Sequence, residues 1–128
     1  MSSNGTGAPI AEMRARFAQG VDDFNALRFW EAHESWEAIW LVAPENEKRF
    51  YQGLIQLAAA YHHMKRGTFR GAARLFQAAL PRLSAYPEAF QHLDRAAAVA
   101  AAARHFGEAE EGRAIGGHDY PKLAFIHG

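Results

Sequence analysis

The sequence predicts an all-α fold: a single compact domain of about five helices, with a central third helix and an irregular C-terminal tail. Two observations support this prediction. Apolar residues recur at intervals of three and four residues through most of the chain, as on one face of a helix. Prolines and glycines interrupt the pattern at separate points and divide it into successive helices. A chain of 128 residues can bury roughly two-thirds of its unfolded surface in one core.

The expected helical domain occupies residues 9–107, between a disordered lead at residues 1–8 and an irregular tail at residues 108–128. The chain begins MSSNGTGAP, which lacks the basic and apolar regions of a signal peptide. The tail contains several glycines and a proline, so regular structure is not expected there. Four residues are expected to pack the tail on the domain: Tyr120, Leu123, Phe125 and Ile126.

The first two helices are expected at residues 9–25 and 29–41. Pro9 suits the first position of a helix, and Pro44 stops the second one. Gly20 lies inside the first helix, where glycine costs up to about 1 kcal/mol relative to alanine. Its presence therefore indicates close packing or a bend.

The third helix is expected to begin near Glu45 and to lie at the centre of the fold. From Phe50 onward it is apolar nearly all round, which is typical of a helix surrounded by others. Gly53 and several alanines would let neighbouring backbones approach closely. Gly67 is expected to end this helix as its C-cap.

Two further helices follow. Thr68 is expected to cap the fourth helix, and Pro81 must kink that helix or end its regular part. Pro87 is expected to open a fifth, alanine-rich helix that continues to about Phe106. The inward side of the fifth helix would hold Phe90, Leu93, Ala97 and Ala100.

The stretch FWEAHESWEAIW, residues 29–40, concentrates tryptophans, acids and an imidazole. His33 and Glu37 are four residues apart, so a helix places both side chains on one face. Trp30 and Trp40 fall close to the same stripe and set these polar groups against indole rings. Because buried polar groups need partners, the pattern points to a site.

The first interpretation of this site is a metal- or small-ligand-binding pocket between the second and third helices. His33 and Glu37 would hold one side of a divalent metal, zinc or another transition metal, which needs at least one further ligand. We expect His63, on the polar flank of the third helix, to supply it. The supporting residues would be Glu34, Gln56, Trp30, Trp40 and Arg49. If the site is catalytic, hydrolysis by a metal-bound water is the expected reaction.

The second interpretation is structural. His33 and Glu37 would form an ion pair, or a buried network with Gln56 and Arg49 that fixes how the two helices pack. The chain would then be a non-catalytic interaction module, a homodimer joined through its tryptophan-rich and alanine-rich helices.

Other basic side chains are weaker candidates. Arg66, Arg70 and Arg74 repeat every fourth residue and form a candidate anion-binding site near the start of the fourth helix. A solvated basic face is the alternative. The histidines expected at the surface are His92, His105, His118 and His127.

The composition argues against several classes of protein. Lys and Arg total 14, as do Asp and Glu, so bulk charge does not favour nucleic acid or a membrane as the partner. No apolar run approaches the ~20 residues that span a bilayer. The chain has no cysteine, which excludes disulfides and thiolate chemistry and fits a reducing compartment. We therefore expect a cytoplasmic protein.

Three segments carry a family resemblance. FNALRFWEAHESWEAIW contains an H-x-x-x-E-x-x-W motif as His33, Glu37 and Trp40, QGLIQLAAAYHHMKRG contains His63, and GAARLFQAAL begins a helix at Gly71. Together these segments resemble DUF309, a family of small helical bacterial and archaeal proteins of unknown function. The likeness covers about residues 24–83.

The resemblance implies an all-helical domain with a motif that has been suggested, in the family, to bind metal. It implies no substrate. Many such sequences have asparagine after the glycine that ends the third helix, where this chain has Thr68. This difference affects a cap or a polar contact at that helix end.

Overall fold

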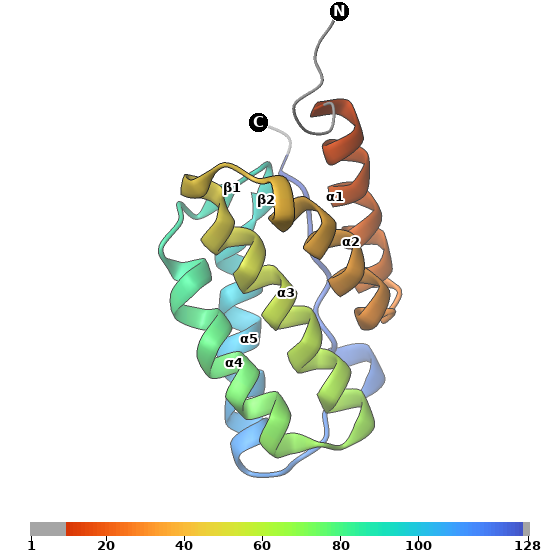
Figure 1. Cartoon of the computed structure of the whole chain (residues 1–128). Coiled ribbons are helices and arrows are strands. Elements are labelled where there is room, and N and C mark those ends of the chain that lie inside the picture. Colours follow the sequence, from red (N-terminus) through yellow and green to blue (C-terminus); the bar gives the residue numbers. More distant parts are fainter. Residues whose placement is uncertain (1–9, 127–128) are drawn as a thin grey trace, which may run out of the picture.

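Helices form the framework of the fold, and the chain passes through them in the order shown in Figure 1. This computed structural model describes residues 10–126, so the predicted lead at residues 1–8 and His127, expected at the surface, lie outside the described residues. Within that range the elements are α1 (Ile10–Asn25), α2 (Phe29–Val42), α3 (Glu45–Arg66), α4 (Phe69–Ser84), β1 (Ala89–Phe90), β2 (Leu93–Asp94), α5 (Arg95–Glu110) and the 3-10 turn η1 (Gly117–Asp119). The all-α prediction is confirmed, and the strands form only a short hairpin.

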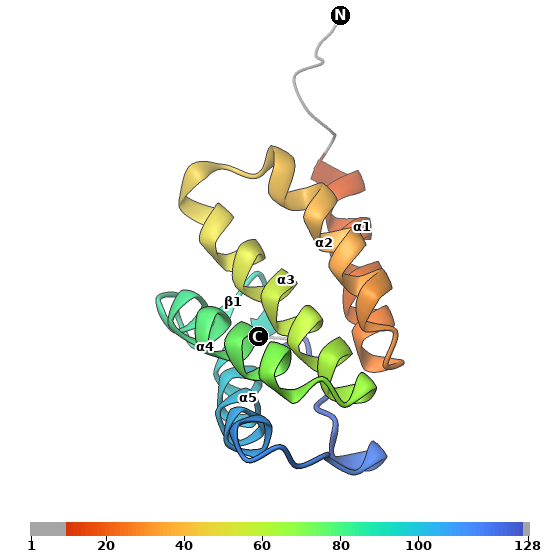
Figure 2. The same cartoon turned by 60° about the horizontal axis from the view of Figure 1, so that its bottom comes forward.

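Helix α3 lies at the centre, as expected, and packs chiefly against α2 and α4 (Figures 1 and 2). A side chain at Gly53 would place its Cβ 2.8 Å from Leu83 Cγ, so the glycine allows α4 to approach. Polar residues interrupt the apolar surface of α3 throughout its 22 residues. None of the helices in residues 10–126 combines the length and the apolar character needed to cross a membrane.

Close packing explains Gly20 in α1. A Cβ at this position would lie 2.6 Å from Trp36 Cδ1, which is far inside normal contact distance. Trp36 is fully buried, and its indole nitrogen donates a hydrogen bond to the Phe17 carbonyl at 3.3 Å. Of the two reasons expected for the glycine, close packing is the one observed.

The connection between α3 and α4 bears out one expectation and overturns another. Gly67 adopts a left-handed conformation (φ 76°) and caps α3, as predicted. Thr68 occupies the N-cap position of α4, as predicted, but a side-chain cap is not formed, because the Thr68 hydroxyl makes no hydrogen bond to that helix. The hydroxyl instead lies within 3.2 Å of the His63 carbonyl and 2.6 Å of His63 Nδ1. Further along, α4 continues through Pro81 to Ser84.

The expected start of the fifth helix at Pro87 is wrong. Residues 89–94 form the hairpin, with Gln91 and His92 at φ 53° and 61°, the pattern of a type I′ turn. Helix α5 begins only at Arg95, where Asp94 accepts a hydrogen bond from the Ala97 amide at 3.0 Å. This later start rotates the expected pattern, so Ala97 and Ala100 are exposed. The buried residues of α5 are Ala98, Ala102, His105 and Ala109.

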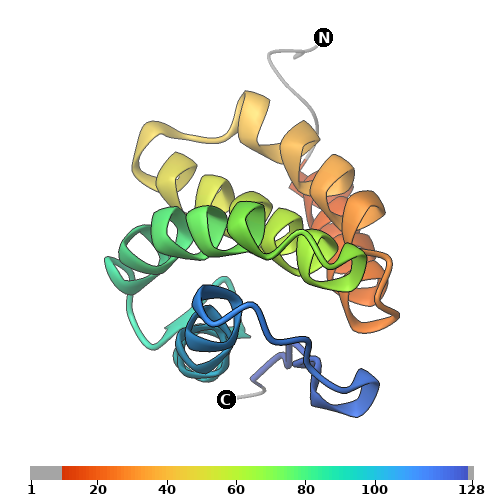
Figure 3. The same ribbon diagram turned by 90° about the horizontal axis from the view of Figure 1, so that it is seen from below.

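The C-terminal tail lies with α5 on the side of α3 opposite to α2 (Figure 3). Tyr120 and Leu123 are buried, whereas Phe125 and Ile126 stay partly exposed. The Asn25 side chain at the end of α1 holds the tail, since it donates to the Leu123 carbonyl at 2.9 Å and accepts from the Leu123 amide at 2.7 Å. The tail thereby covers the core on the side of α3 opposite to α2.

Candidate binding site between helices α2 and α3

The side chains expected to form a site lie along the contact between α2 and α3. These two antiparallel helices are aligned by two contacts: Lys48 Nζ lies 4.8 Å from the Trp40 ring, and the ring centroids of Trp30 and His62 are 5.4 Å apart. Along the chain, His33 lies between Trp30 and Trp40 on α2, and Gln56 lies between Lys48 and His62 on α3. We call this line, with Trp30, His33, Gln56 and His62, the α2–α3 seam.

Two buried polar atoms in the seam have no hydrogen-bond partner. They are Nδ1 of His33 and Oε1 of Gln56. A buried polar atom left without a partner costs about 1–3 kcal/mol, so native proteins rarely keep one without a reason. The two atoms belong to neighbouring helices, and both are candidate contacts for a polar group from outside the chain.

Aromatic rings form the outer part of the seam. The Trp30 indole stacks on the His33 ring, with centroids 4.6 Å apart and planes at 10°. Trp30 is 48% exposed, so this indole covers His33 from the solvent side. Burial, followed by the neighbouring His63 and Arg66, lowers the pKa of His62 below its ordinary value. His62 is therefore mostly uncharged at neutral pH.

His63 is held in place by α4. Its Nδ1 lies 2.6 Å from the Thr68 hydroxyl, and a Cβ at Gly71 would lie 3.2 Å from the same nitrogen. If the single Thr68 hydrogen goes to the His63 carbonyl, Nδ1–H donates to Thr68 and Nε2 keeps its lone pair. We assign this tautomer because every polar group of the pair then has a partner. An imidazole of this kind can accept a hydrogen bond or bind a metal.

The remaining residues of the predicted site do not close over His33. Glu34, Glu37 and Arg49 are exposed. Among residues 10–126, His33 and Glu37 do not form an ion pair with each other. The predicted network with Gln56 is not formed either, because His33 Nδ1 and Gln56 Oε1 have no hydrogen-bond partner. The part of the chain that the structure describes contains no group of three or more His, Cys, Asp or Glu side chains placed to hold a metal. Metal binding stays a prediction.

The residues of the candidate anion site are also exposed to solvent. Arg66, Arg70 and Arg74 are exposed, and none of them forms an ion pair within residues 10–126. Anion binding by these arginines stays a prediction, beside the alternative of a solvated basic face.

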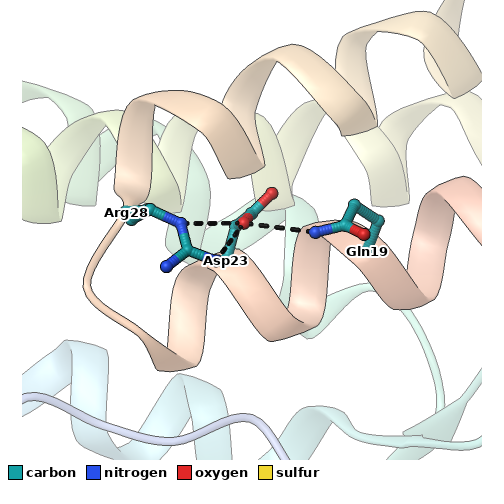
Figure 4. A network of polar contacts seen from close by, with 3 residues as sticks. All are labelled: Gln19, Asp23 and Arg28. Atoms are coloured by element: carbon teal, nitrogen blue, oxygen red, sulfur yellow. Dashed lines mark hydrogen bonds and ion pairs between the residues drawn. The ribbon is translucent and has the colours of Figure 1, made fainter.

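Sequence reasoning missed a polar cluster at the end of α1. Asp23 is only 6% exposed, and its Oδ1 accepts hydrogen bonds from Arg28 at 2.7 and 3.0 Å and from Gln19 at 3.3 Å (Figure 4). The Arg28 amide also donates to the Asp23 carbonyl at 2.8 Å. This cluster lies at the turn between α1 and α2, and Asp23 Oδ1 receives three hydrogen bonds from protein donors. The i,i+4 spacing of Gln19 and Asp23 was its only signal in the sequence.

His105 was expected at the surface, and this expectation is wrong. It is 4% exposed, and its Nδ1 lies 2.6 Å from the Tyr61 hydroxyl. The reason is the later start of α5, which turns His105 inward with Ala98, Ala102 and Ala109. The helical spacing of these three alanines was the signal that could have found it.

Comparisons with known proteins agree with the family resemblance. Residues 17–75 match the DUF309 family model, described as a domain of unknown function. The uncharacterised protein YpuF of Bacillus subtilis is 37% identical over 73 residues, which are 56% of this chain and 42% of that protein. An uncharacterised protein of Aquifex aeolicus is 33% identical over 72 residues, 56% of this chain and 22% of that protein. The matches thus span less than half of either relative. No solved structure is significantly similar.

Proposed function

Because residues 17–75 match DUF309, a family with no assigned function, we propose a function from the α2–α3 seam itself. The protein binds a small polar ligand there, with His33 and Gln56 as direct contacts. The observation that carries this proposal is the pair of buried atoms without partners, His33 Nδ1 and Gln56 Oε1. Gln56 Oε1 can only accept a hydrogen bond, so the ligand must bring a donor such as an amine, amide or hydroxyl.

The surroundings of the seam support binding. Trp30 covers the His33 ring and would have to move aside when a ligand enters. His63 offers the lone pair of Nε2 in the tautomer assigned above, and Glu37 brings a carboxylate nearby on α2. A divalent transition metal is one guest that suits these groups, since imidazole and carboxylate are among its usual ligands. His33, Glu37 and His63 would hold it.

The test is the content of the untagged protein, measured by native mass spectrometry and by elemental analysis before and after incubation with Zn²⁺. The variants are His33→Phe and Gln56→Leu, which keep the size of each side chain but remove its polar atoms. His118→Phe is the matched control, because His118 is exposed and lies outside the seam.

Wild type and the His118 control are expected to hold about one guest, a small molecule or a zinc ion, per chain. His33→Phe and Gln56→Leu should lose it while keeping the helical circular dichroism spectrum. Equal guest content in all four proteins, or none in any of them, would contradict the proposal.

The outer face of α2 favours a second candidate function, self-association. Three of the large apolar side chains that are exposed lie on this helix: Trp30 (48%), Leu41 (65%) and Val42 (51%). The carboxylates of Glu34 and Glu37 lie between them, exposed and without ion pairs within residues 10–126. A partner for this face must therefore offer both apolar contact and positive charge.

A second copy of this chain has that charge. Lys65, Arg66, Arg70 and Arg74 are exposed at the junction of α3 and α4 and form a basic patch. The charges of Arg66, Lys65 and Glu31 of α2 all act on the pKa of His62. A two-fold axis passing near His62 would set Glu34 and Glu37 of each copy against the basic patch of the other. We infer a homodimer of this kind, which sedimentation at low and high salt would detect.

Charge-swap variants decide the arrangement. Glu34→Arg and Arg70→Glu should each weaken the dimer, and the double variant should partly restore it because the two substituted side chains again carry opposite charges. Arg14→Glu, on the exposed side of α1, is the control that should leave it unchanged. A wild type that sediments as a monomer at all concentrations would end this proposal.

A further inference from the structure

A second polar site lies across α3 from the seam, between α5 and the C-terminal tail. A cavity of about 230 Å³ is lined there by Arg104, His105, Glu108, Ile115 and Asp119. The first three residues come from α5 and the last two from the tail, which lies beside α5 in Figure 3. All five fall outside residues 17–75, so the family match does not cover this cavity.

One lining residue of the cavity, His105, is paired with Tyr61, which is buried behind it. Their contact, Nδ1 to hydroxyl, is 2.6 Å long, and the side chains are 4% and 0% exposed. Tyr61 is fixed by edge contacts with the Phe24 and Phe76 rings. Burial raises the pKa of the Tyr61 hydroxyl, which therefore stays protonated.

The pair settles which nitrogen of His105 carries its proton. The Tyr61 hydroxyl needs an acceptor, and His105 Nδ1 is the partner that the described residues provide. Burial, followed by the charge of Arg104, lowers the pKa of His105, so the ring is neutral at pH 7. The proton of a neutral ring whose Nδ1 accepts must be on Nε2. His105 lines the cavity, so this Nε2–H is the donor offered to it.

The charged groups around this donor differ in whether they already form an ion pair. Glu108 is already paired with Arg113, whose Nε lies 2.7 Å from Glu108 Oε1. Arg104 and Asp119 form no ion pair within residues 10–126. The cavity therefore presents two donors for an anionic group, Arg104 and His105, and one carboxylate for a cation. Ile115 supplies an apolar wall.

We propose that this cavity binds a small zwitterion of the α-amino acid type. The ligand carboxylate lies against Arg104 and the Nε2–H of His105, its ammonium faces Asp119, and its short side chain contacts Ile115. The volume of about 230 Å³ is below the usual range for drug-sized ligands, so the ligand is limited to a few heavy atoms. Tyr61 is a positioning residue, since it acts on the ligand only through His105.

L-Valine is a suitable probe, because two analogues each lack one of its charges. Isobutylamine lacks the carboxylate and isovalerate lacks the ammonium. Binding is followed by NMR through the Ile115 methyl groups and the Asp119 amide. Valine at millimolar concentration is expected to give saturable shifts, and each analogue should bind about tenfold more weakly because one charge-assisted contact is lost.

Variants separate the contacts. Arg104→Gln and Asp119→Asn change exposed side chains, so the fold should survive, and each should weaken valine binding about tenfold. Tyr61→Phe releases His105 Nδ1 and should weaken valine and isovalerate alike while leaving isobutylamine unchanged. Arg14→Gln is the control. The proposal is overturned if valine gives no saturable shift, if isovalerate binds as well as valine, or if Arg104→Gln and Asp119→Asn bind like wild type.

Discussion

At the scale of single residues, the main feature of the α2–α3 seam is that His33 and Gln56 lack hydrogen-bond partners. Each keeps a buried polar atom without a partner, whereas the more deeply buried Asp23 accepts hydrogen bonds from both Arg28 and Gln19. Outside the proposed site, the chain therefore does supply hydrogen-bond partners to a buried acid. The two open atoms in the seam are consistent with selection for binding at the expense of stability.

Gln56→Leu should raise the free energy of unfolding by about 1 kcal/mol, because it removes a buried acceptor that has no hydrogen bond to lose. Urea unfolding of the ligand-free protein measures the change. Gln77→Leu, at an exposed position of α4, should leave stability nearly unchanged. If Gln56→Leu destabilises the protein instead, the amide has a partner and the seam is a structural network.

The buried His105 should make stability depend on pH. Burial, then Arg104, lowers its folded pKa below the ordinary 6.5, while Asp119 and Glu108 oppose the shift. As the pH falls through 6.5 the unfolded chain takes up a proton first, so the folded state loses stability down to the folded pKa. Above 6.5 this contribution to stability is fully present.

The control for this prediction is His105→Asn, whose side-chain oxygen can still accept from Tyr61 but does not titrate. Between about pH 7.5 and about pH 5, wild type should lose more stability than the variant, measured by urea unfolding. His62 has a lowered pKa as well, but it is present in both proteins and cancels in the difference. Parallel pH curves for the two proteins would show that His105 does not titrate in this range.

At the scale of the helices, glycines set how closely the elements approach. Gly20→Ala should cost about 1–3 kcal/mol, because the new methyl group meets the buried Trp36 ring. Gly107→Ala in α5 is the matched control: nothing lies within 4 Å of its Cβ position, so helix propensity should raise stability by up to about 1 kcal/mol. Thermal unfolding would reveal both effects, and equal effects of the two substitutions would refute the close approach of α1 and α2.

The sequence predicts helices well where apolar spacing is long and regular, as in α1 to α4. It failed at residues 87–94, because Gln91 and His92 adopt positive φ without the glycine or asparagine that normally marks a type I′ turn. Because of that error, the predicted start of α5 was wrong and His105 was expected at the surface. In the seam, spacing alone placed His33 beside Trp30, but it could not show that Glu37 is exposed and not paired with His33, or that Gln56 Oε1 is unpaired. Those facts depend on rotamers and on contacts between helices.

At the scale of the whole molecule, the tail links the two ends of the fold. Asn25 holds the backbone of Leu123 through two hydrogen bonds, and the Asp94 amide donates to the Ala124 carbonyl at 2.9 Å. The tail thereby connects the end of α1 to the hairpin before α5. It also supplies Ile115 and Asp119 to the cavity, so its attachment controls the second site.

Asn25→Ala should therefore lower stability by about 1–3 kcal/mol, because the buried backbone groups of Leu123 lose their partners. Limited proteolysis should then cut the tail sooner than in wild type. Asn46→Ala is the control, since that exposed residue contributes only its backbone carbonyl, which accepts from Tyr86. Unchanged proteolysis of the Asn25 variant would mean that the tail is held by Tyr120 and Leu123 packing alone.

The most direct measurement of the proposed function is a crystal structure of the untagged protein as purified, at a resolution where single waters are visible. The account predicts density larger than one water, or an anomalous metal peak, within hydrogen-bond or ligand distance of His33 Nδ1 and Gln56 Oε1. A seam in which both atoms bond to protein groups, or share a single water, would contradict it.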